Sequence, residues 1–212
     1  MKLKFHHIAI LSFALGAVSC KKDNYDAPEN RFNGRIVYQG EPVNVEYNQV
    51  NLELWQPGFG RNGAINLLID QNGNFSQQLF DGNYKLTIGG GQGPFIWPKN
   101  AAGVNDTIAI SINGDQTKDI EVTPYYLVRN AQFAAANGNV TATFRVDKII
   151  TDANAKDIER ISLYVNKTQF VSGANNINKV DLTITPTTDL TNLSASVSVP
   201  AMTPSQNYVF AR

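Results

Sequence analysis

The sequence predicts an all-β protein. After residue 30, short runs rich in Val, Ile, Thr, Tyr and Phe alternate with clusters of Gly, Asn, Asp and Pro. No stretch keeps a helical apolar period for three turns, and the best helical segment, 152–160, is short and polar. Thr123-Pro124 divides the pattern, because proline cannot donate to a sheet ladder. We therefore expect two tandem β-sandwich domains, over residues 31–123 and 124–212.

Residues 1–19 have the three parts of a secretory signal peptide: a basic start, an apolar middle and small residues at the cleavage site. Ala17-Val18-Ser19-Cys20 resembles a bacterial lipobox, in which the cysteine is lipidated and becomes the mature N-terminus. Cys20 is the only cysteine, so it has no disulfide partner. The alternative is a plain secretory signal, with Cys20 merely early in the mature chain.

Residues 20–30 are polar and end in turn formers, which is the composition of a tether. The apolar middle of the signal is too short for a membrane-spanning helix, which needs about 20 residues. We therefore expect a lipid on Cys20 to be the membrane attachment. The multiple acyl chains of a bacterial lipoprotein would hold stably, whereas one chain is marginal.

The composition excludes several classes of function. Removal of Lys2 and Lys4 with the signal leaves 16 basic and 18 acidic residues, with no basic stripe, so nucleic acid is not an expected partner. His6 and His7 are the only histidines, and both lie in the signal. The mature chain therefore lacks the residues of Ser-His-Asp and Cys-His nucleophile systems and of His/Cys zinc sites. We expect no cofactor and no metal.

The first domain reads as seven strands joined by turns. Segment 50–54 alternates apolar and polar residues, as a half-buried strand does. The Asp81-Gly82 pair marks a tight turn. Other turns are expected at 39–42 and 70–73. The expected strands are 32–38, 50–54, 64–69, 74–79, 83–88, 106–112 and 118–122.

Four motifs in this domain carry a resemblance. They are Gly34-Arg35-Ile36, Gly40-Glu41-Pro42-Val43, Asp70-x-x-Gly73-x-Phe75 and Asp81-Gly82-Asn83-Tyr84-Lys85-Leu86. In order and spacing they resemble the prealbumin-like, carboxypeptidase-regulatory-like β-sandwich. Glycines permit the positive φ of the turns, and Phe75, Tyr84 and Leu86 are expected to fill the core.

The second domain is expected to form strands at 125–133, 140–146, 158–165, 179–184 and 193–199. Residues 202–210 resemble the corner of fibronectin type III domains, in which a tyrosine hydroxyl bonds back to the upstream backbone. Tyr208 would then open the sixth strand, and the sequence stops at Arg212 inside it. A seventh strand is expected to be missing, which implies either truncation or an open sheet edge.

The whole order resembles one family. A lipobox, a polar tether, a prealbumin-like domain and a fibronectin III-like domain are similar to Bacteroidetes outer-membrane lipoproteins of unknown function, often encoded beside SusC/SusD-type glycan-uptake pairs. The resemblance implies display at the outer membrane, at the cell surface, and an accessory role in glycan capture or in an outer-membrane transport complex. Asp23 and Asp26 look like surface-export tags, although a solvated tether has the same residues.

Two loops, 55–63 and 89–100, are longer and more aromatic than a sandwich requires, and they hold both tryptophans. Aromatic platforms beside amide and charged groups bind sugars. The candidate contact residues are Trp55, Phe59 and Arg61 in the first loop, and Phe95, Trp97 and Lys99 in the second. In the alternative interpretation, Trp55 caps the core and Trp97 packs between the domains.

The acidic residues do not single out an enzyme. Asp70, Asn72, Asn74 and Asp81 have the spacing of EF-hand ligands, but Phe75 stands where that loop needs glycine, which favours a hairpin turn. No carboxylate pair is marked as a glycosidase dyad. We expect a non-enzymatic binding or assembly accessory, or alternatively a structural or adhesive protein-protein interaction module without a carbohydrate ligand. Joint exposure of Trp55 and Trp97 would favour sugar binding.

Overall fold

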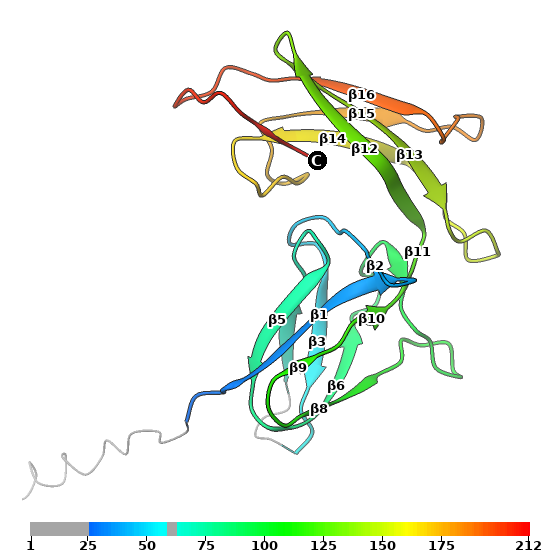
Figure 1. Ribbon diagram of the computed structural model, residues 1–212. Helices are drawn as coiled ribbons and strands as arrows, with labels where there is room; N and C mark the ends of the chain where they lie inside the picture. The colour runs from blue at the N-terminus through cyan, green and yellow to red at the C-terminus, as the bar shows by residue number, and fades with distance from the viewer. Residues whose placement is uncertain (1–25, 59–62) are drawn as a thin grey trace, which may run out of the picture.

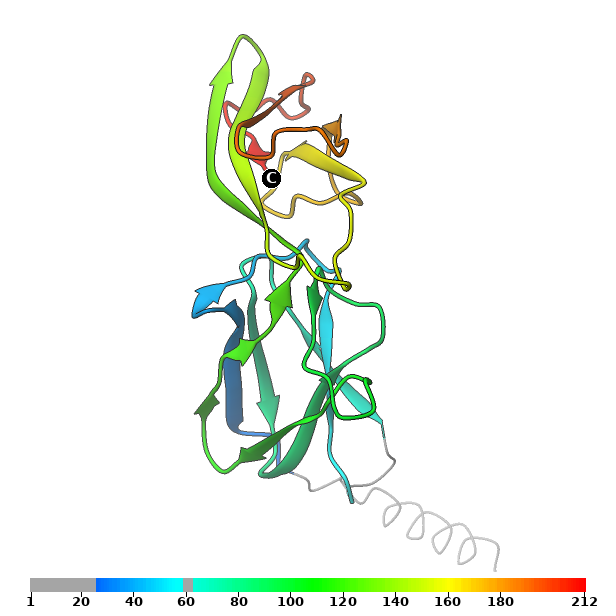
Figure 2. The same cartoon turned by 90° about the vertical axis from the view of Figure 1, so that its right-hand side faces the viewer.

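The computed structural model describes residues 26–58 and 63–212, and all of its regular structure there is β-strand. Two β-sandwich domains follow one another along the chain and lie end to end (Figures 1 and 2). The predicted all-β class and the two tandem sandwiches are confirmed. The segment 152–160, the best helical candidate, contains turns and the start of a strand.

The first domain packs two sheets face to face. One is built around β1 (Asn30–Tyr38), which is antiparallel to β2 and β5 and parallel to β9 and β10. The other has the order β4-β3-β6-β8 and is antiparallel throughout. Their bounds are β2 Glu41–Pro42, β3 Asn51–Trp55, β4 Ala64–Leu68, β5 Asn74–Leu79, β6 Gly82–Ile88, β8 Ile108–Ile112, β9 Gln116–Thr117 and β10 Ile120–Glu121.

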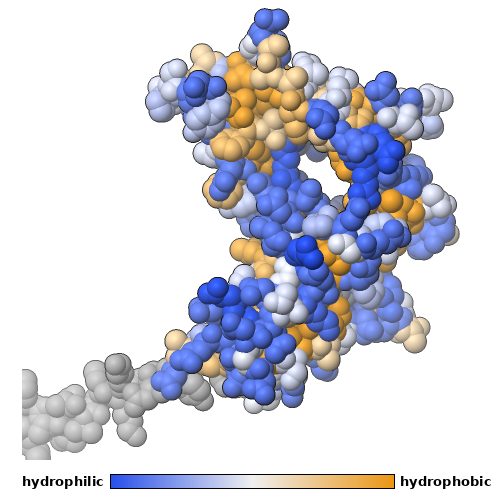
Figure 3. Space-filling model, viewed as in Figure 1, coloured by the Kyte–Doolittle hydropathy of each residue, from blue (hydrophilic) through white to orange (hydrophobic). Residues whose placement is uncertain are grey.

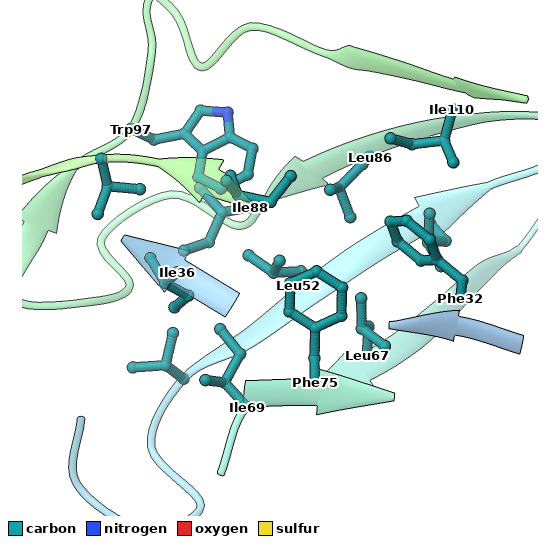
Figure 4. Packing of buried hydrophobic residues seen from close by; sticks show 14 of the residues in the cluster. Phe32, Ile36, Leu52, Leu67, Ile69, Phe75, Leu86, Ile88, Trp97 and Ile110 are labelled. Atoms are coloured by element: carbon teal, nitrogen blue, oxygen red, sulfur yellow. The ribbon is translucent and has the colours of Figure 1, made fainter. Parts of the chain in front are cut away.

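The core of this domain lies between the two sheets. Leu52 and Leu54 point inward from β3, and their neighbours Asn51, Glu53 and Trp55 are only half-buried, as the alternating sequence predicts. Figure 4 shows Phe32 and Phe75 among the aliphatic side chains of both sheets, and their ring centroids lie 5.3 Å apart. The predicted core residues Phe75, Tyr84 and Leu86 are all buried.

Two glycines of the motifs are required by geometry. A Cβ at Gly34 would lie 2.0 Å from the Lys118 carbonyl oxygen and 2.4 Å from Phe75 Cζ, so only glycine fits between them. Gly73 has a φ of 81°, which ends the tight turn between β4 and β5. The motif positions are therefore fixed by close approach in one case and by turn conformation in the other.

The second domain also has two sheets. Strands β12 (Tyr126–Ala136), β13 (Asn139–Lys148) and β16 (Leu193–Ser198) form one, and β15 (Asn178–Thr183), β14 (Arg160–Asn166) and β17 (Phe210–Ala211) form the other. Its buried hydrophobic cluster consists of Val140, Ala142, Leu163, Val165, Ala195 and Val197. Among the described residues β17 is the sixth strand of the domain, and β14 is its one paired neighbour.

The predicted tyrosine corner is not formed by Tyr208. Its side chain is 59% exposed and packs edge-on against Phe210 at 5.7 Å, and within residues 26–58 and 63–212 its hydroxyl has no bond to the upstream backbone. The first domain has such a bond instead, because the buried Tyr84 hydroxyl donates to the Phe80 carbonyl oxygen at 2.9 Å. Burial raises the pKa of Tyr84, the bond to Phe80 lowers it, and the charge of Asp81 raises it.

The connection between the domains is short. Strand β7 (Phe95–Ile96) pairs with β11 (Thr123–Pro124), and β12 begins directly afterwards at Tyr126. The Thr123-Pro124 pair is thus part of a paired strand directly before β12, and the boundary at 123/124 stays a prediction. Within the described residues, no helix is long and apolar enough to cross a membrane.

Candidate functional site

The second of the two predicted aromatic loops belongs to the core. Trp97 is 2% exposed, and its indole Nε1 donates to the Asp106 carbonyl oxygen at 2.9 Å. Phe95 is buried in the same cluster. The prediction that Phe95 and Trp97 belong to a sugar platform is therefore corrected: both rings are core residues of the first domain. Lys99 is exposed, and its Nζ lies 2.5 Å from Asn105 Oδ1.

The first predicted loop is described only at its ends. Trp55 is the last residue of β3 and is half-buried, and its Nε1 donates to Glu53 Oε2 at 3.1 Å. Phe59 and Arg61 lie outside the described residues. Trp55 and Trp97 are thus not exposed together, and the two loops do not join their tryptophans into one platform.

The two domains are tied together at a seam, formed by Val45, Glu46, Gln71, Gln169, Gly173 and Arg212. Arg212 Nη2 donates to the Val45 carbonyl oxygen at 2.5 Å and to the Gln71 carbonyl oxygen at 2.7 Å. The backbone N–H of Gly173 donates to Glu46 Oε1 at 2.5 Å. Gln71 Nε2 donates to the Gln169 carbonyl oxygen at 3.1 Å. These bonds fix loops of the first domain against a loop of the second.

Arg212 is the central cation of this seam. Its burial lowers the pKa of the guanidinium, and the nearby charges of Glu46 and Asp70 raise it. An arginine keeps its charge under such a shift, because its ordinary pKa lies above 12. The seam therefore holds a permanent positive charge between two carboxylates, with its N–H groups used by backbone oxygens of the first domain.

An aromatic pair lies across the seam. Tyr47 of the first domain and Phe170 of the second have ring centroids 4.8 Å apart at an interplanar angle of 39°. Both rings remain accessible, with exposures of 37% and 41%. Each domain supplies one ring, so the pair exists only when the seam is closed. Neither residue stands out in the sequence, since both are single aromatics in polar loops far apart along the chain.

A depression of about 330 Å³ adjoins this pair. We call it the seam depression; its lining is Tyr47, Asn48, Leu68, Ile69, Asp70, Asn74, Phe75 and Ser76. Leu68 supplies an exposed apolar side chain. Carboxylate, amide and hydroxyl groups lie beside an aromatic ring, which is the mixture of apolar surface and few polar groups typical of small-ligand sites.

Asp70 has a structural role in this lining. Its Oδ1 accepts the backbone N–H groups of Asn72 and Asn74 at 2.8 Å each, and its Oδ2 accepts Asn74 Nδ2 at 3.0 Å. The carboxylate thus closes the turn that leads into β5. The hairpin-turn interpretation fits this geometry, and no cluster of three or more His, Cys, Asp or Glu that could hold a metal is found among the described residues.

Two family models match the chain. One, described as "Protein of unknown function (DUF3823) N-terminal domain", matches residues 30–123. The other, described as "Domain of unknown function (DUF3823_C)", matches residues 126–212. Among curated proteins, none matches the chain.

Solved structures have the same fold over most of the chain. A DUF3823 family protein from Bacteroides ovatus is 30% identical, with a TM-score of 0.72 over 86% of this chain and 88% of that one. Another from Parabacteroides merdae is 31% identical, with a TM-score of 0.69 over 82% of each chain. A Bacteroides uniformis protein named "putative carbohydrate binding protein" is 19% identical, with a TM-score of 0.60 over 81% of this chain and 80% of that one.

The resemblance to an uncharacterised Bacteroidetes family is therefore confirmed, while the link to SusC/SusD-type pairs stays a prediction. Because both family models match in order and together cover nearly all residues after the tether, this chain belongs to the DUF3823 family.

Proposed function

We propose that this chain is a non-enzymatic glycan-binding accessory, and that the seam depression with its Tyr47–Phe170 pair is the contact site. The observation that carries the proposal is this accessible aromatic pair, built from both domains beside amide, hydroxyl and carboxylate groups. Aromatic side chains bury much apolar area with little loss of conformational freedom, and the polar groups orient the ligand. The name of the Bacteroides uniformis neighbour supports the same ligand class.

The test is binding of the soluble chain without residues 1–20 to a panel of plant and microbial polysaccharides, measured by affinity electrophoresis and calorimetry. Tyr47→Ala and Phe170→Ala are expected to weaken binding at least about tenfold each, since each removes half of the pair. Phe133→Ala is the matched control, because its ring is exposed on β12, a strand that contributes none of the named seam residues. Equal loss in the control and in the seam variants would contradict the site.

We propose further that a lipid on Cys20 holds the protein at the outer membrane, at the cell surface, where it serves a glycan-uptake complex. The support is the lipobox at 17–20 and the polar tether that follows. Cys20→Ala is expected to release the protein from the membrane fraction of cells. Full retention of this variant in the membrane would sink the anchoring proposal, and protease treatment of intact cells tests surface exposure of the wild type.

A second candidate function is a protein-protein interaction module without a sugar ligand. It is favoured by large exposed apolar side chains in the second domain, among them Val128, Phe133 and Tyr208. Figure 3 shows hydrophobic surface over the outer end of this domain. If no polysaccharide binds, and Phe133→Ser abolishes a cross-link to an outer-membrane protein in cells, this second function replaces the first.

A further inference from the structure

A second depression, of about 660 Å³, lies on the outer face of the β1 sheet. We call it the sheet depression; its lining is Asn33, Gly34, Arg35, Asn74, Phe75, Ser76, Thr117 and Asp119. In β1 and β5, Asn33 is opposite Ser76 and Arg35 is opposite Asn74, and Ser76 Oγ lies 2.7 Å from Asn33 Oδ1. Directly opposite residues of antiparallel strands point to the same face, so these side chains form a polar row on the outside of the sandwich.

The two depressions adjoin at β5. Asn74, Phe75 and Ser76 contribute to the lining of both. One end of the combined surface carries the Tyr47–Phe170 pair, and the other carries Arg35 and Asp119 on β1 and beside β10. A ligand that lies along this surface meets apolar ring faces first and then amide, hydroxyl and ionic groups.

The charged groups of this lining are already engaged. Arg35 Nη2 lies 2.6 Å from Asp119 Oδ2, and Arg35 Nε donates to Asp119 Oδ1 at 3.3 Å. The Asp70 carboxylate accepts three hydrogen bonds within its own turn. Arg35 and Asp119 offset each other's charge, so an acidic ligand would find no unpaired cation in the lining. Uncharged hydroxyl groups can bond to the engaged groups without breaking their existing contacts.

From this arrangement we infer that the two depressions form one extended site for a linear, uncharged polysaccharide, with sugar rings against Tyr47 and Phe170 and hydroxyl groups bonded to the Asn33–Arg35 row. The inference rests on the proposed glycan-binding function and specifies its ligand. Each depression alone has a volume that suits a small ligand. A chain that fills both makes more hydrogen bonds than a short fragment, so affinity rises with chain length until both are occupied.

The experiment is calorimetric titration of the soluble protein with cello-, manno- and xylo-oligosaccharides of increasing length, from about two to about eight sugars, a span that exceeds either depression alone. The wild type is expected to bind the long members at least about tenfold more tightly than the disaccharide of the same series. Asn33→Ala is expected to weaken binding of the long member about tenfold and to leave the disaccharide unchanged. Tyr47→Ala is expected to weaken both.

Asn83→Ala is the matched control, because Asn83 is an exposed asparagine of β6 outside both depressions. Thr117→Val is the second variant of the sheet depression, used if Asn33→Ala loses its circular dichroism spectrum. Affinity that is independent of length, or unchanged in the variants of the sheet depression while Tyr47→Ala weakens binding, overturns the extended site and leaves the proposed function standing.

Tighter binding of homogalacturonan, an acidic polysaccharide, than of any neutral series overturns the uncharged ligand class. Absence of binding to every oligosaccharide and to the parent polymers overturns the proposed function together with the inference.

Discussion

The two domains are stabilised in different ways. Among the described residues the first core gathers twenty buried hydrophobic side chains, five of them aromatic, whereas the second gathers six, all aliphatic. Both domains have similar lengths of matched sequence, so the first removes far more apolar area from water. We infer that the first domain is the stable body, and that the second depends more on its long β12–β13 hairpin and on the seam.

The largest expected effect is a core truncation in the stable domain. Leu52 is fully buried, so Leu52→Ala is expected to lower the free energy of unfolding of the first domain by about 2–5 kcal/mol. Val165→Ala is the matched change in the second core. Urea unfolding is followed by tryptophan fluorescence, which reports only the first domain because Trp55 and Trp97 both lie there, and by circular dichroism, which reports both.

Two separate transitions are expected, with the second domain unfolding at the lower urea concentration and without a change in fluorescence. Leu52→Ala then moves only the transition of the first domain, which is seen by both signals, and leaves the earlier circular dichroism transition of the second domain in place. If both variants shift both signals equally, the domains unfold as one unit and the contrast between their cores is irrelevant to stability.

The next effect comes from close approach within the first domain. Gly34→Ala places a Cβ against the Lys118 carbonyl and the Phe75 ring, which must move apart, and is expected to cost about 1–3 kcal/mol. Gly90→Ala is the control, because a Cβ there meets nothing within 4 Å. Thermal unfolding of both variants measures the difference, and an unchanged melting temperature for Gly34→Ala would contradict the tight packing of β1 against Lys118.

The third prediction compares Tyr84, whose hydroxyl bonds to the backbone, with Tyr208, the tyrosine of the predicted corner. Tyr84→Phe removes a buried hydrogen bond to Phe80 and is expected to cost about 1 kcal/mol. Tyr208→Phe removes an exposed hydroxyl and is expected to leave stability unchanged. Chemical denaturation of both variants measures the loss of unfolding free energy. A larger loss for Tyr208→Phe than for Tyr84→Phe would indicate that Tyr208 forms a tyrosine corner in the second domain.

The smallest effect concerns the partly exposed Arg35–Asp119 pair. The hydrogen bond from Arg35 holds the pKa of Asp119 below its ordinary value. A carboxyl with a lowered folded-state pKa contributes stability above its unfolded pKa, about 4, and loses that contribution as pH falls through the folded value. The stability difference between wild type and Asp119→Asn is thus expected to be constant above about pH 5 and to shrink below about pH 4. If the stability difference between wild type and Asp119→Asn instead grows as pH falls, the lowered pKa of Asp119 is contradicted.

Much of the fold could be predicted from local sequence. The alternation at 50–54 predicts β3, and the motif around Asp70 and Gly73 predicts the turn between β4 and β5. Both predictions succeed because period-two burial and positive φ are short-range constraints. Strands 118–122 and 125–133 were less well predicted: the first is broken into two-residue pieces beside Lys118, and the second extends to Ala136. Where a strand ends depends on which neighbouring strand pairs with it, and this pairing cannot be predicted from the local sequence.

The candidate site shows the limit of reasoning from loops and composition. Loop 89–100 is rich in glycine and aromatics, yet Phe95 and Trp97 fold back into the core because Trp97 finds a backbone acceptor at Asp106. Tyr47 and Phe170 carry no local signal, and they meet only because two domains close on one another. A single exposed aromatic side chain becomes a candidate contact residue only when the structure shows a second ring from another domain against it.

The sequence by itself determined the all-β class with two tandem sandwiches, the inward alternation of the strands and the glycine turns, since each depends on residues close together in the chain. The resemblance of residues 17–20 to a lipobox also rests on local sequence alone, and lipidation of Cys20 stays a prediction. The tertiary structure alone decided which aromatic rings are buried, which tyrosine forms a corner and which loops of the two domains meet. Those outcomes depend on competition for core space and for backbone partners among residues that are distant in sequence.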